Sequence, residues 1–169
     1  MPHQNCTAIS LIGMPGVGKS TLGALLAKRL GYHFVDTDLI LQQRAGATLQ
    51  AVLLRDGYQA LRDLEAAILL EIPLHDSVIA TGGSAVYSSA AMQRLAAAGP
   101  IIYLYAAVEV LADRVGGLAQ RGVASPPDHS LHDVFAERAP LYARYATHTV
   151  DTSGTTVDEV VNDVCQCLP

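Results

Sequence analysis

Residues 13–20 read Gly-Met-Pro-Gly-Val-Gly-Lys-Ser, the spacing G-x-x-x-x-G-K-S of a phosphate-binding P-loop. Its three glycines allow a tight turn in which backbone N–H groups point at an anion. Lys19 adds a positive charge for the outer phosphates, and Ser20 offers its hydroxyl to Mg²⁺. Thr21 opens a predicted helix whose positive end faces the same phosphates. The stretch therefore predicts a nucleotide site; the alternative is a glycine-rich turn that binds nothing.

The sequence on both sides of this loop predicts a strand before it and a helix after it. Residues 8–12 are mostly apolar, as in a buried parallel strand. Leucines at positions 22, 25, 26 and 30 recur at helical spacing, and Gly31 ends the predicted helix. Strand, loop and helix in this order form the context in which the motif binds phosphate.

The composition of the chain predicts one folded domain over residues 1–169, because half of the residues are hydrophobic and only 16% are charged. The formal net charge of −5 and the lack of a basic run argue against a nucleic-acid partner. The apolar stretches are too short or too interrupted to span a bilayer, and the first residues lack the charged start of a signal peptide. We expect a cytoplasmic monomer with no membrane partner.

Cysteines and histidines give weaker signals. Cys6, Cys165 and Cys167 do not form a disulfide framework, and we expect reduced thiols. Cys165 and Cys167 have the spacing of a metal-binding pair, but no second pair has the spacing of a zinc site. His129 and His132 lie in a Pro-rich stretch, where solvated side chains are favoured over a ligand role.

Short apolar runs alternate with helical patterns along the rest of the chain, which predicts an α/β fold with a five-stranded parallel sheet. The expected strands cover residues 8–12, 33–35, 77–81, 101–105 and 147–150. Residues 116–130 are rich in Gly, Ala, Ser and Pro and lack periodicity, which predicts a mobile lid. The first expected helix is opened by Thr21 and ended by Gly31. An alanine-rich helix is expected to be capped by Ser88 or Ser89 and to end at Gly99-Pro100. The other expected helices cover 39–45, a segment capped by Thr48, 58–70, 108–115, 131–145 (kinked or restarted near Pro140) and 157–168.

The apolar spacing within two helices also predicts which side chains face the core. Leu61, Leu64 and Ile68 form one stripe of the helix over 58–70. The last helix begins with the capping box formed by Thr156 and Glu159. Its expected inward residues are Val157, Val160, Val161, Val164 and Leu168.

Chemistry-bearing residues follow three of the predicted strands, whose carboxyl ends share one edge of the sheet. The first strand leads to the P-loop, the second to Asp36 and Asp38, and the third to Gly82 and Gly83. On an extended backbone Asp36 and Asp38 point the same way, so that one could organise Mg²⁺ and the other accept a proton from a hydroxyl. The alternative is that they cap the next helix, with Asp38 as the candidate cap.

Arginine is used far more than lysine, with nine Arg against two Lys. Arginine suits carboxylate and phosphate oxygens, although GC-rich coding would give the same bias. Arg62 precedes Glu65 by three residues, so the two can meet on one helix face. That pair is either an exposed ion pair of little energy or a tether that holds a guanidinium at a substrate carboxylate. Arg121 lies within the expected lid, and Arg138 follows it.

The ordered motifs resemble those of shikimate kinases over nearly the whole chain. They are the P-loop through Thr21, Asp36-Thr37-Asp38, Asp56-Gly57 with Arg62 and Glu65, Thr81-Gly82-Gly83, and Glu137-Arg138-Ala139-Pro140-Leu141-Tyr142. The resemblance implies a three-layer P-loop kinase fold related to nucleoside monophosphate kinases, with a lid over about 116–130. It also implies ATP and Mg²⁺ as cofactors, and shikimate or a similar hydroxy acid as the small-molecule partner.

The resemblance further implies a role for each matching residue. Lys19, Asp38 and Arg121 are the expected catalytic residues, and Ser20 and Asp36 are expected to serve Mg²⁺. Asp38 would bind the substrate hydroxyls and either act as the base or orient the attacking oxygen. Arg62 and Arg138 are expected to clamp the substrate carboxylate. The substrate site would comprise Asp38, Arg62, Gly82, Gly83 and Arg138. The ATP site would comprise Gly13, Pro15, Gly16, Val17, Gly18, Lys19, Ser20, Thr21, Arg114 (near the adenine) and Arg121.

Three departures from the family pattern bear on the acceptor. Ser84 stands where the family usually has a third glycine, Gly122-Val123-Ala124 follows the lid arginine where Pro and Leu are usual, and Leu53 and Leu61 replace aromatic residues. The leading hypothesis is ATP-dependent phosphorylation of the 3-hydroxyl of shikimate. The alternatives are a kinase of another small hydroxy acid or polyol, and a nucleotide-binding protein without catalysis.

Overall fold

Five parallel strands form the central sheet of the computed structural model, which describes residues 8–168. The strand order is β2-β3-β1-β4-β5, so β1 lies in the middle, with its Leu11 opposite Ala80 and Ile102. Apolar side chains on both faces bury the central strands, as parallel sheets require. The strands are β1 (Ala8–Ile12), β2 (His33–Asp36), β3 (Ser77–Ala80), β4 (Ile101–Tyr105) and β5 (His148–Asp151).

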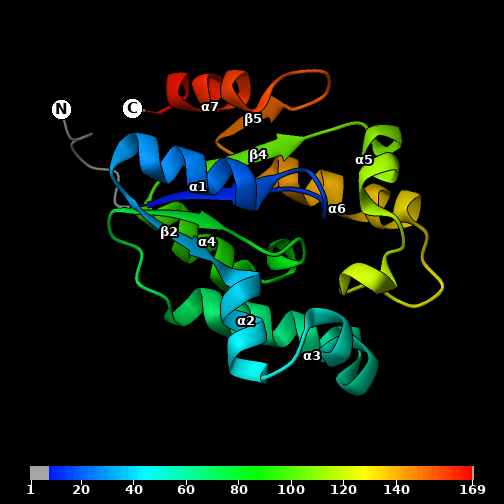
Figure 1. Ribbon diagram of the computed structural model, residues 1–169. Helices are drawn as coiled ribbons and strands as arrows, with labels where there is room; N and C mark the ends of the chain where they lie inside the picture. The colour runs from blue at the N-terminus through cyan, green and yellow to red at the C-terminus, as the bar shows by residue number, and fades with distance from the viewer. Residues whose placement is uncertain (1–7, 169) are drawn as a thin grey trace.

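Helices cover both faces of this sheet, which confirms the predicted α/β fold with three layers (Figure 1). Helices α1 and α7 lie on one face, and α4 and α6 lie on the other. Helices α2 and α3 pack on each other beyond the β2 edge. The helices are α1 (Lys19–Leu30), α2 (Thr37–Ala45), α3 (Leu49–Glu71), α4 (Ser89–Ala98), α5 (Val108–Val115), α6 (Leu131–Tyr145) and α7 (Val157–Gln166), with short 3₁₀ turns η1 (Ala85–Tyr87) and η2 (Ala119–Arg121).

Local capping signals set several helix starts as the sequence predicts. The Thr48 hydroxyl accepts a hydrogen bond from the Ala51 amide at the start of α3, and Ser88 caps α4 in the same way. The predicted capping box of Thr156 and Glu159 is present in α7. Helix α6 runs as one helix with Pro140 inside it, rather than restarting there.

Two helices differ from the prediction in which side chains they bury. Helix α3 has non-helical backbone angles at Gly57, with φ 84° and ψ 169°, so two helical segments meet there. In its second segment Leu64 is 37% exposed, and Glu65 takes the inward place. In α7, Val157 is 43% exposed rather than buried. The buried face of α3 is therefore rotated from the expected stripe, whereas α7 buries Val160, Val161 and Val164 as predicted and exposes its first residue.

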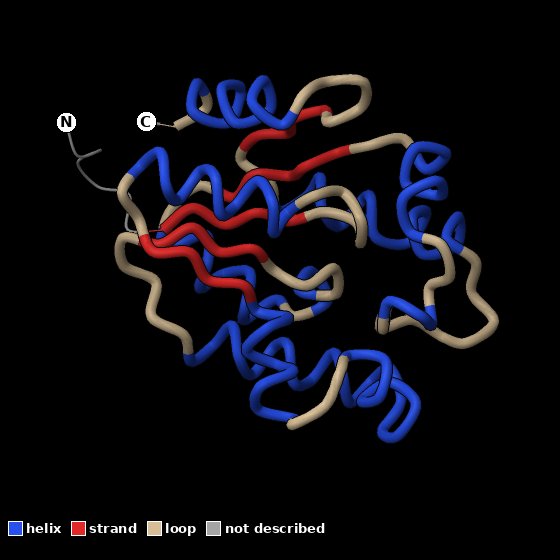
Figure 2. The backbone as a smooth tube through the Cα atoms, viewed as in Figure 1, coloured by secondary structure: helices blue, strands red, loops and turns tan. Residues whose placement is uncertain are grey.

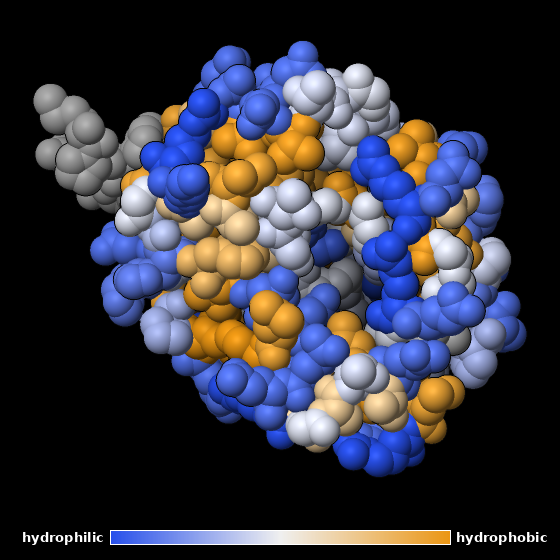
Figure 3. Space-filling model, in the orientation of Figure 1, coloured by the Kyte–Doolittle hydropathy of each residue, from blue (hydrophilic) through white to orange (hydrophobic). Residues whose placement is uncertain are grey.

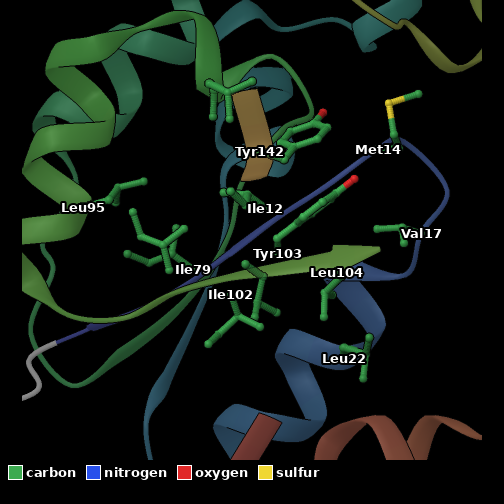
Figure 4. Close-up of a cluster of buried hydrophobic side chains, with 14 of the residues drawn as sticks. Ile12, Met14, Val17, Leu22, Ile79, Leu95, Ile102, Tyr103, Leu104 and Tyr142 are labelled. Carbon is green, nitrogen blue, oxygen red and sulfur yellow. The ribbon is translucent and has the colours of Figure 1, made fainter. Parts of the chain in front are cut away.

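The core ties the sheet to a turn that follows β3. Along β4, Ile102 and Leu104 point towards the side of α1, whereas Tyr103 faces Tyr142 of α6 (Figure 4). The rings of Tyr103 and Tyr142 lie 5.1 Å apart between centroids. The hydroxyl of Tyr142, itself fully buried, donates to the Gly83 carbonyl at 2.5 Å. The core therefore holds the Gly82-Gly83 turn in place through the hydroxyl of Tyr142.

None of the helices described over residues 8–168 is long and apolar enough to cross a membrane.

Candidate active site

A cavity of about 370 Å³ opens at the carboxyl ends of β1 and β3. Parallel α/β sheets bind their ligands at this edge. The strands lead into loops there (Figure 2), and the space-filling view is hollowed at the corresponding place (Figure 3). The lining residues are Pro15, Gly16, Gly18, Lys19, Ser20, Thr21, Asp38, Leu41, Leu49, Leu61, Glu65, Thr81, Gly82, Gly83, Ser84, Arg121, Gly122, Val123, Ala124 and Arg138.

The P-loop forms one wall of this cavity. Gly18 adopts φ 106° and precedes α1, whose first residue is Lys19. The Lys19 Nζ atom donates to the Gly13 carbonyl at 2.7 Å and to the Met14 carbonyl at 2.9 Å. Burial lowers the pKa of Lys19 to about 8, although Asp38 and Glu65 act in the opposite direction. The loop thus holds a buried ammonium group beside the start of a helix, an arrangement suited to phosphate.

Asp36 lies at the end of β2 and bonds to the P-loop serine. The Ser20 hydroxyl donates to Asp36 Oδ2 at 2.6 Å. Asp36 Oδ1 accepts from the amides of Asp38 and Leu39, at 3.0 and 3.3 Å, and so caps α2. The capping role therefore belongs to Asp36, not to Asp38. Asp36 and Asp38 do not share the predicted extended backbone, because α2 begins at Thr37 and Asp38 stands in its first turn.

Two buried carboxyl groups, Asp38 and Glu65, meet beneath the Gly82 backbone. A Cβ atom on Gly82 would collide with the Glu65 carboxyl and lie 2.8 Å from Asp38 Oδ1, so only glycine fits there. Burial raises the pKa of Asp38, against the attraction of Lys19. Burial and then the Asp38 charge raise the pKa of Glu65 to about 7. The Ser84 hydroxyl donates to Glu65 Oε2, whereas Oε1 has no hydrogen-bond partner among residues 8–168.

Arg62 and Arg138 converge on a single oxygen atom. The Ala124 carbonyl accepts from Arg62 Nε at 3.0 Å and from Arg138 Nη2 at 2.8 Å. Arg138 is 1% exposed and lines the cavity, whereas Arg62 lies outside the lining residues. The predicted pairing of Arg62 with Glu65 is not formed: the ion pair of Arg62 is with Glu137, at 3.9 Å. The helix directs Glu65 inward to Ser84 instead.

The segment 116–130 contributes Arg121, Gly122, Val123 and Ala124 to the lining of the cavity. Arg121 lines the cavity, and its guanidinium donates to the carbonyls of Val115 at 2.8 Å and Arg114 at 2.6 Å. A Cβ atom built on Gly16 would lie 3.8 Å from Arg121 Nη1 and 3.9 Å from Arg114 Cβ. Both arginines therefore stand beside the P-loop.

Only some of the remaining residues that the sequence analysis named line the cavity. Leu61 lines the cavity and is 4% exposed, whereas Leu53 is only half-buried and outside the lining residues. Gly13, Val17, Asp36 and Arg114 also lie outside the lining residues. Sequence reasoning missed the Ala124 carbonyl and the inward position of Glu65. A carbonyl is present at every residue, so no sequence signal marks it.

The cysteines and histidines do not gather into a site in the described part of the chain. Cys165 and Cys167 are free thiols, and Cys6 lies outside the described residues. Within residues 8–168, no group of three or more His, Cys, Asp and Glu side chains could hold a metal ion. His129 Nδ1 lies 3.9 Å from Glu137 Oε2.

The chain is similar in sequence to known proteins. The family model of shikimate kinase matches residues 15–169. The shikimate kinase of Mycobacterium avium is 37% identical over 162 residues, which cover 94% of this chain and 92% of that protein. Shikimate kinase 2 of Yersinia enterocolitica is 36% identical over 165 residues, covering 95% and 94%.

A solved structure gives the same result for the fold. The shikimate kinase of Acinetobacter baumannii, in complex with shikimate, superposes with a TM-score of 0.85 at 29% identity, over 96% of this chain and 93% of that one. Sequence and structure agree over nearly the full length. This chain belongs to the shikimate kinase family.

Proposed function

We propose that the protein transfers the γ-phosphoryl group of ATP to the 3-hydroxyl of shikimate, giving shikimate 3-phosphate and ADP. The observation that carries the proposal is the convergence of Arg62 and Arg138 on one oxygen position, beside a cavity that also holds the P-loop and Asp38. A carboxylate is a stronger acceptor than the Ala124 carbonyl for two guanidinium groups. A small acid that carries a hydroxyl fits this combination.

The reaction joins the two ends of the cavity. The 3-hydroxyl oxygen attacks the γ-phosphorus, its proton passes to Asp38, and the bond from the γ-phosphorus to the bridging oxygen breaks as ADP leaves. Lys19 and Arg121 supply positive charge where the transferred group becomes more anionic. Arg114 stands next to Arg121 and borders the nucleotide side. The backbones of Gly82 and Gly83 border the acceptor.

The hydroxyl of Ser20 and the carboxylate of Asp36 fit a bound Mg²⁺. Both are hard oxygen groups, they lie 2.6 Å apart, and they stand at the mouth of the P-loop. Magnesium in such sites keeps several waters and takes few protein ligands in addition to phosphate oxygens. When bound, the ion would neutralise charge on the β- and γ-phosphates.

Four further proposals concern the molecule as a whole. Residues 1–169 act as one kinase domain, and residues 116–130 act as a lid that excludes water from the reaction. The protein works as a monomer in the cytoplasm. The burial of Val123 and Ala124 against the rest of the site supports the lid role.

The decisive experiment measures ADP release by the purified protein with Mg-ATP, in the presence and absence of shikimate. We expect turnover that depends on shikimate and little ADP release without it. The same assay with a panel of hydroxy acids and polyols tests the alternative acceptors, because the true acceptor has the highest kcat/KM. Tight ATP binding without turnover on any acceptor would favour a non-catalytic role.

A further inference from the structure

Tyr87 lies between the two arginines that converge on the Ala124 carbonyl. It ends the 3₁₀ turn η1, a few residues beyond Gly83. The Arg62 Cζ atom lies 3.8 Å from the centroid of the Tyr87 ring, and the Arg138 Cζ atom lies 5.4 Å from it. Both distances are within the range of cation–π attraction.

The hydroxyl of Tyr87 connects the same groups by hydrogen bonds. It accepts from Arg138 Nε at 3.4 Å and donates to Glu137 Oε1. The same Glu137 oxygen lies 3.9 Å from Arg62 Nη2. One tyrosine therefore stacks on one guanidinium, bonds to the other, and holds the carboxylate that pairs with the first.

We propose that Tyr87 is a positioning residue for the carboxylate-binding pair Arg62 and Arg138, and so sets the preference of the site for an anionic acceptor. The inference rests on the proposed function, since the carboxylate belongs to the proposed substrate. Tyr87 does not line the cavity among residues 8–168, so it acts through the arginines rather than by touching the acceptor.

The contacts of Tyr87 leave an N–H group of each arginine directed at the Ala124 carbonyl. Arg62 stacks its face on Tyr87, and its Nε–H points to the Ala124 carbonyl. Arg138 Nε donates to the Tyr87 hydroxyl, and Arg138 Nη2 donates to the same carbonyl. Because Tyr87 already holds the two arginine side chains, they lose less conformational freedom when they bind a carboxylate. Loss of Tyr87 should therefore weaken the affinity for the acceptor.

Packing alone does not account for Tyr87. The other two members of η1, Ala85 and Val86, are buried in the core, whereas Tyr87 is half-buried and directs its hydroxyl at charged groups. Its position also lies outside the motifs on which the family resemblance rests. A side chain that only filled space would affect charged and neutral acceptors equally.

The test compares shikimate with its neutral methyl ester as acceptors for the wild type, Tyr87→Phe and Tyr87→Leu. We expect Tyr87→Leu to raise the KM and Kd for shikimate about tenfold, and to leave those for the ester and for ATP unchanged. Tyr87→Phe keeps the stacked ring and loses only the hydroxyl, so we expect a smaller rise of a few fold. The matched control is Tyr145→Leu, which removes a stack on the remote Arg144.

Binding is measured by calorimetry as well as by turnover, so that the two proposals fail in different ways. Equal losses for acid and ester, or an unchanged preference for the acid in Tyr87→Leu, would overturn the role of Tyr87. A wild type that binds shikimate but does not phosphorylate it would overturn the proposed function alone, and the Kd values would still decide the role of Tyr87. A wild type that binds neither acid nor ester would overturn both.

Discussion

Individual residues at this site owe their chemistry to buried charge. Lys19, Asp38 and Glu65 share one small volume in which burial works against every ionised form. The ammonium group loses affinity for its proton, and the two carboxyl groups gain it. Their mutual attraction offsets part of this cost. The pKa values of Lys19 and Glu65, about 8 and about 7, lie near neutral pH, so substitutions of these residues should be visible in pH-dependent measurements.

Glu65 should make folding stability fall as the pH rises from about 4.5 to about 7. Its pKa is raised from 4.5 to about 7 in the folded protein, so over that range the unfolded chain has released a proton that the folded protein still holds. Stability conferred by the protonated form is complete below pH 4.5 and is lost as the pH passes through 7. The free energy of unfolding that depends on Glu65 is on the order of 3 kcal/mol over this range. Urea unfolding of wild type and Glu65→Gln across this range measures the difference, which should be smaller in the variant.

The exposed Glu109 provides the control for this measurement. Glu109→Gln should show the same pH dependence as the wild type, because that side chain is in solvent. Asp38 has a raised pKa as well and contributes in the same direction, so the variant retains part of the slope. Identical slopes for wild type and Glu65→Gln would contradict a neutral buried Glu65.

Asp36 and Asp38 should give different losses when each is changed to asparagine. Asp38→Asn removes the proton acceptor and should lower kcat by about 10²- to 10⁴-fold with little change in ATP affinity. Asp36→Asn keeps a good helix cap, so folding stability should persist while activity requires more Mg²⁺. Steady-state kinetics at several Mg²⁺ concentrations separate the two. Asp36→Ala is the control, because it also loses the cap and about 1 kcal/mol of stability.

At the scale of elements, the contact between the segment 116–130 and the start of α3 depends on Gly122. Its φ is +64°, and a Cβ atom there would lie 2.5 Å from Leu49 Cβ and 2.6 Å from the Gln50 amide nitrogen. Gly122→Ala should push the turn away from α3, lower kcat several-fold, and expose the segment to protease. Gly117→Ala is the matched control, since its nearest neighbour is the flexible Gln120 side chain at 3.4 Å. Equal kinetics and proteolysis in the two variants would argue against this contact.

Some helices and strands could be predicted from the sequence more fully than others. The strand, loop and helix around the P-loop follow from local patterns, and they appear where expected. Helix faces are harder, because positions three and four residues after Leu61 lie close together on the helix. Hydrophobicity favours Leu64 as the inward residue. Glu65 takes that place instead, and its carboxyl group accepts a hydrogen bond from the Ser84 hydroxyl.

The contact partners of Arg62 in distant parts of the chain could not be predicted from the sequence. Arg62 contacts the Tyr58 ring on its own helix. Its other contacts come from Tyr87, Ala124 and Glu137, which three other segments supply. A tertiary contact of this kind has no periodic signal. The residue types of the site could be predicted, whereas the pairing among them required the fold.

At the scale of the molecule, the cavity lies between two groups of elements that meet at the edge of the sheet. In the proposed function, the P-loop, α1 and the end of α5 would form the nucleotide side. The Gly82-Gly83 turn, α2, α3 and α6, which line the cavity, would form the acceptor side. Tyr142 joins the acceptor side to the core through the Gly83 carbonyl and the ring of Tyr103. The two sides should therefore bind their ligands by separate sets of residues.

Ligand-linked stability should show this separation. A ligand present at a hundredfold excess over its Kd stabilises the folded state by about 2.7 kcal/mol. In urea unfolding, the wild type should gain stability from Mg-ATP and, independently, from shikimate. Lys19→Met should lose most of the nucleotide gain and keep the shikimate gain, because Arg138 and Asp38 remain in place. Lys28→Met, at the exposed lysine near the end of α1, should keep both gains. If Lys19→Met lost both gains, the nucleotide and acceptor sides would be one cooperative unit rather than two.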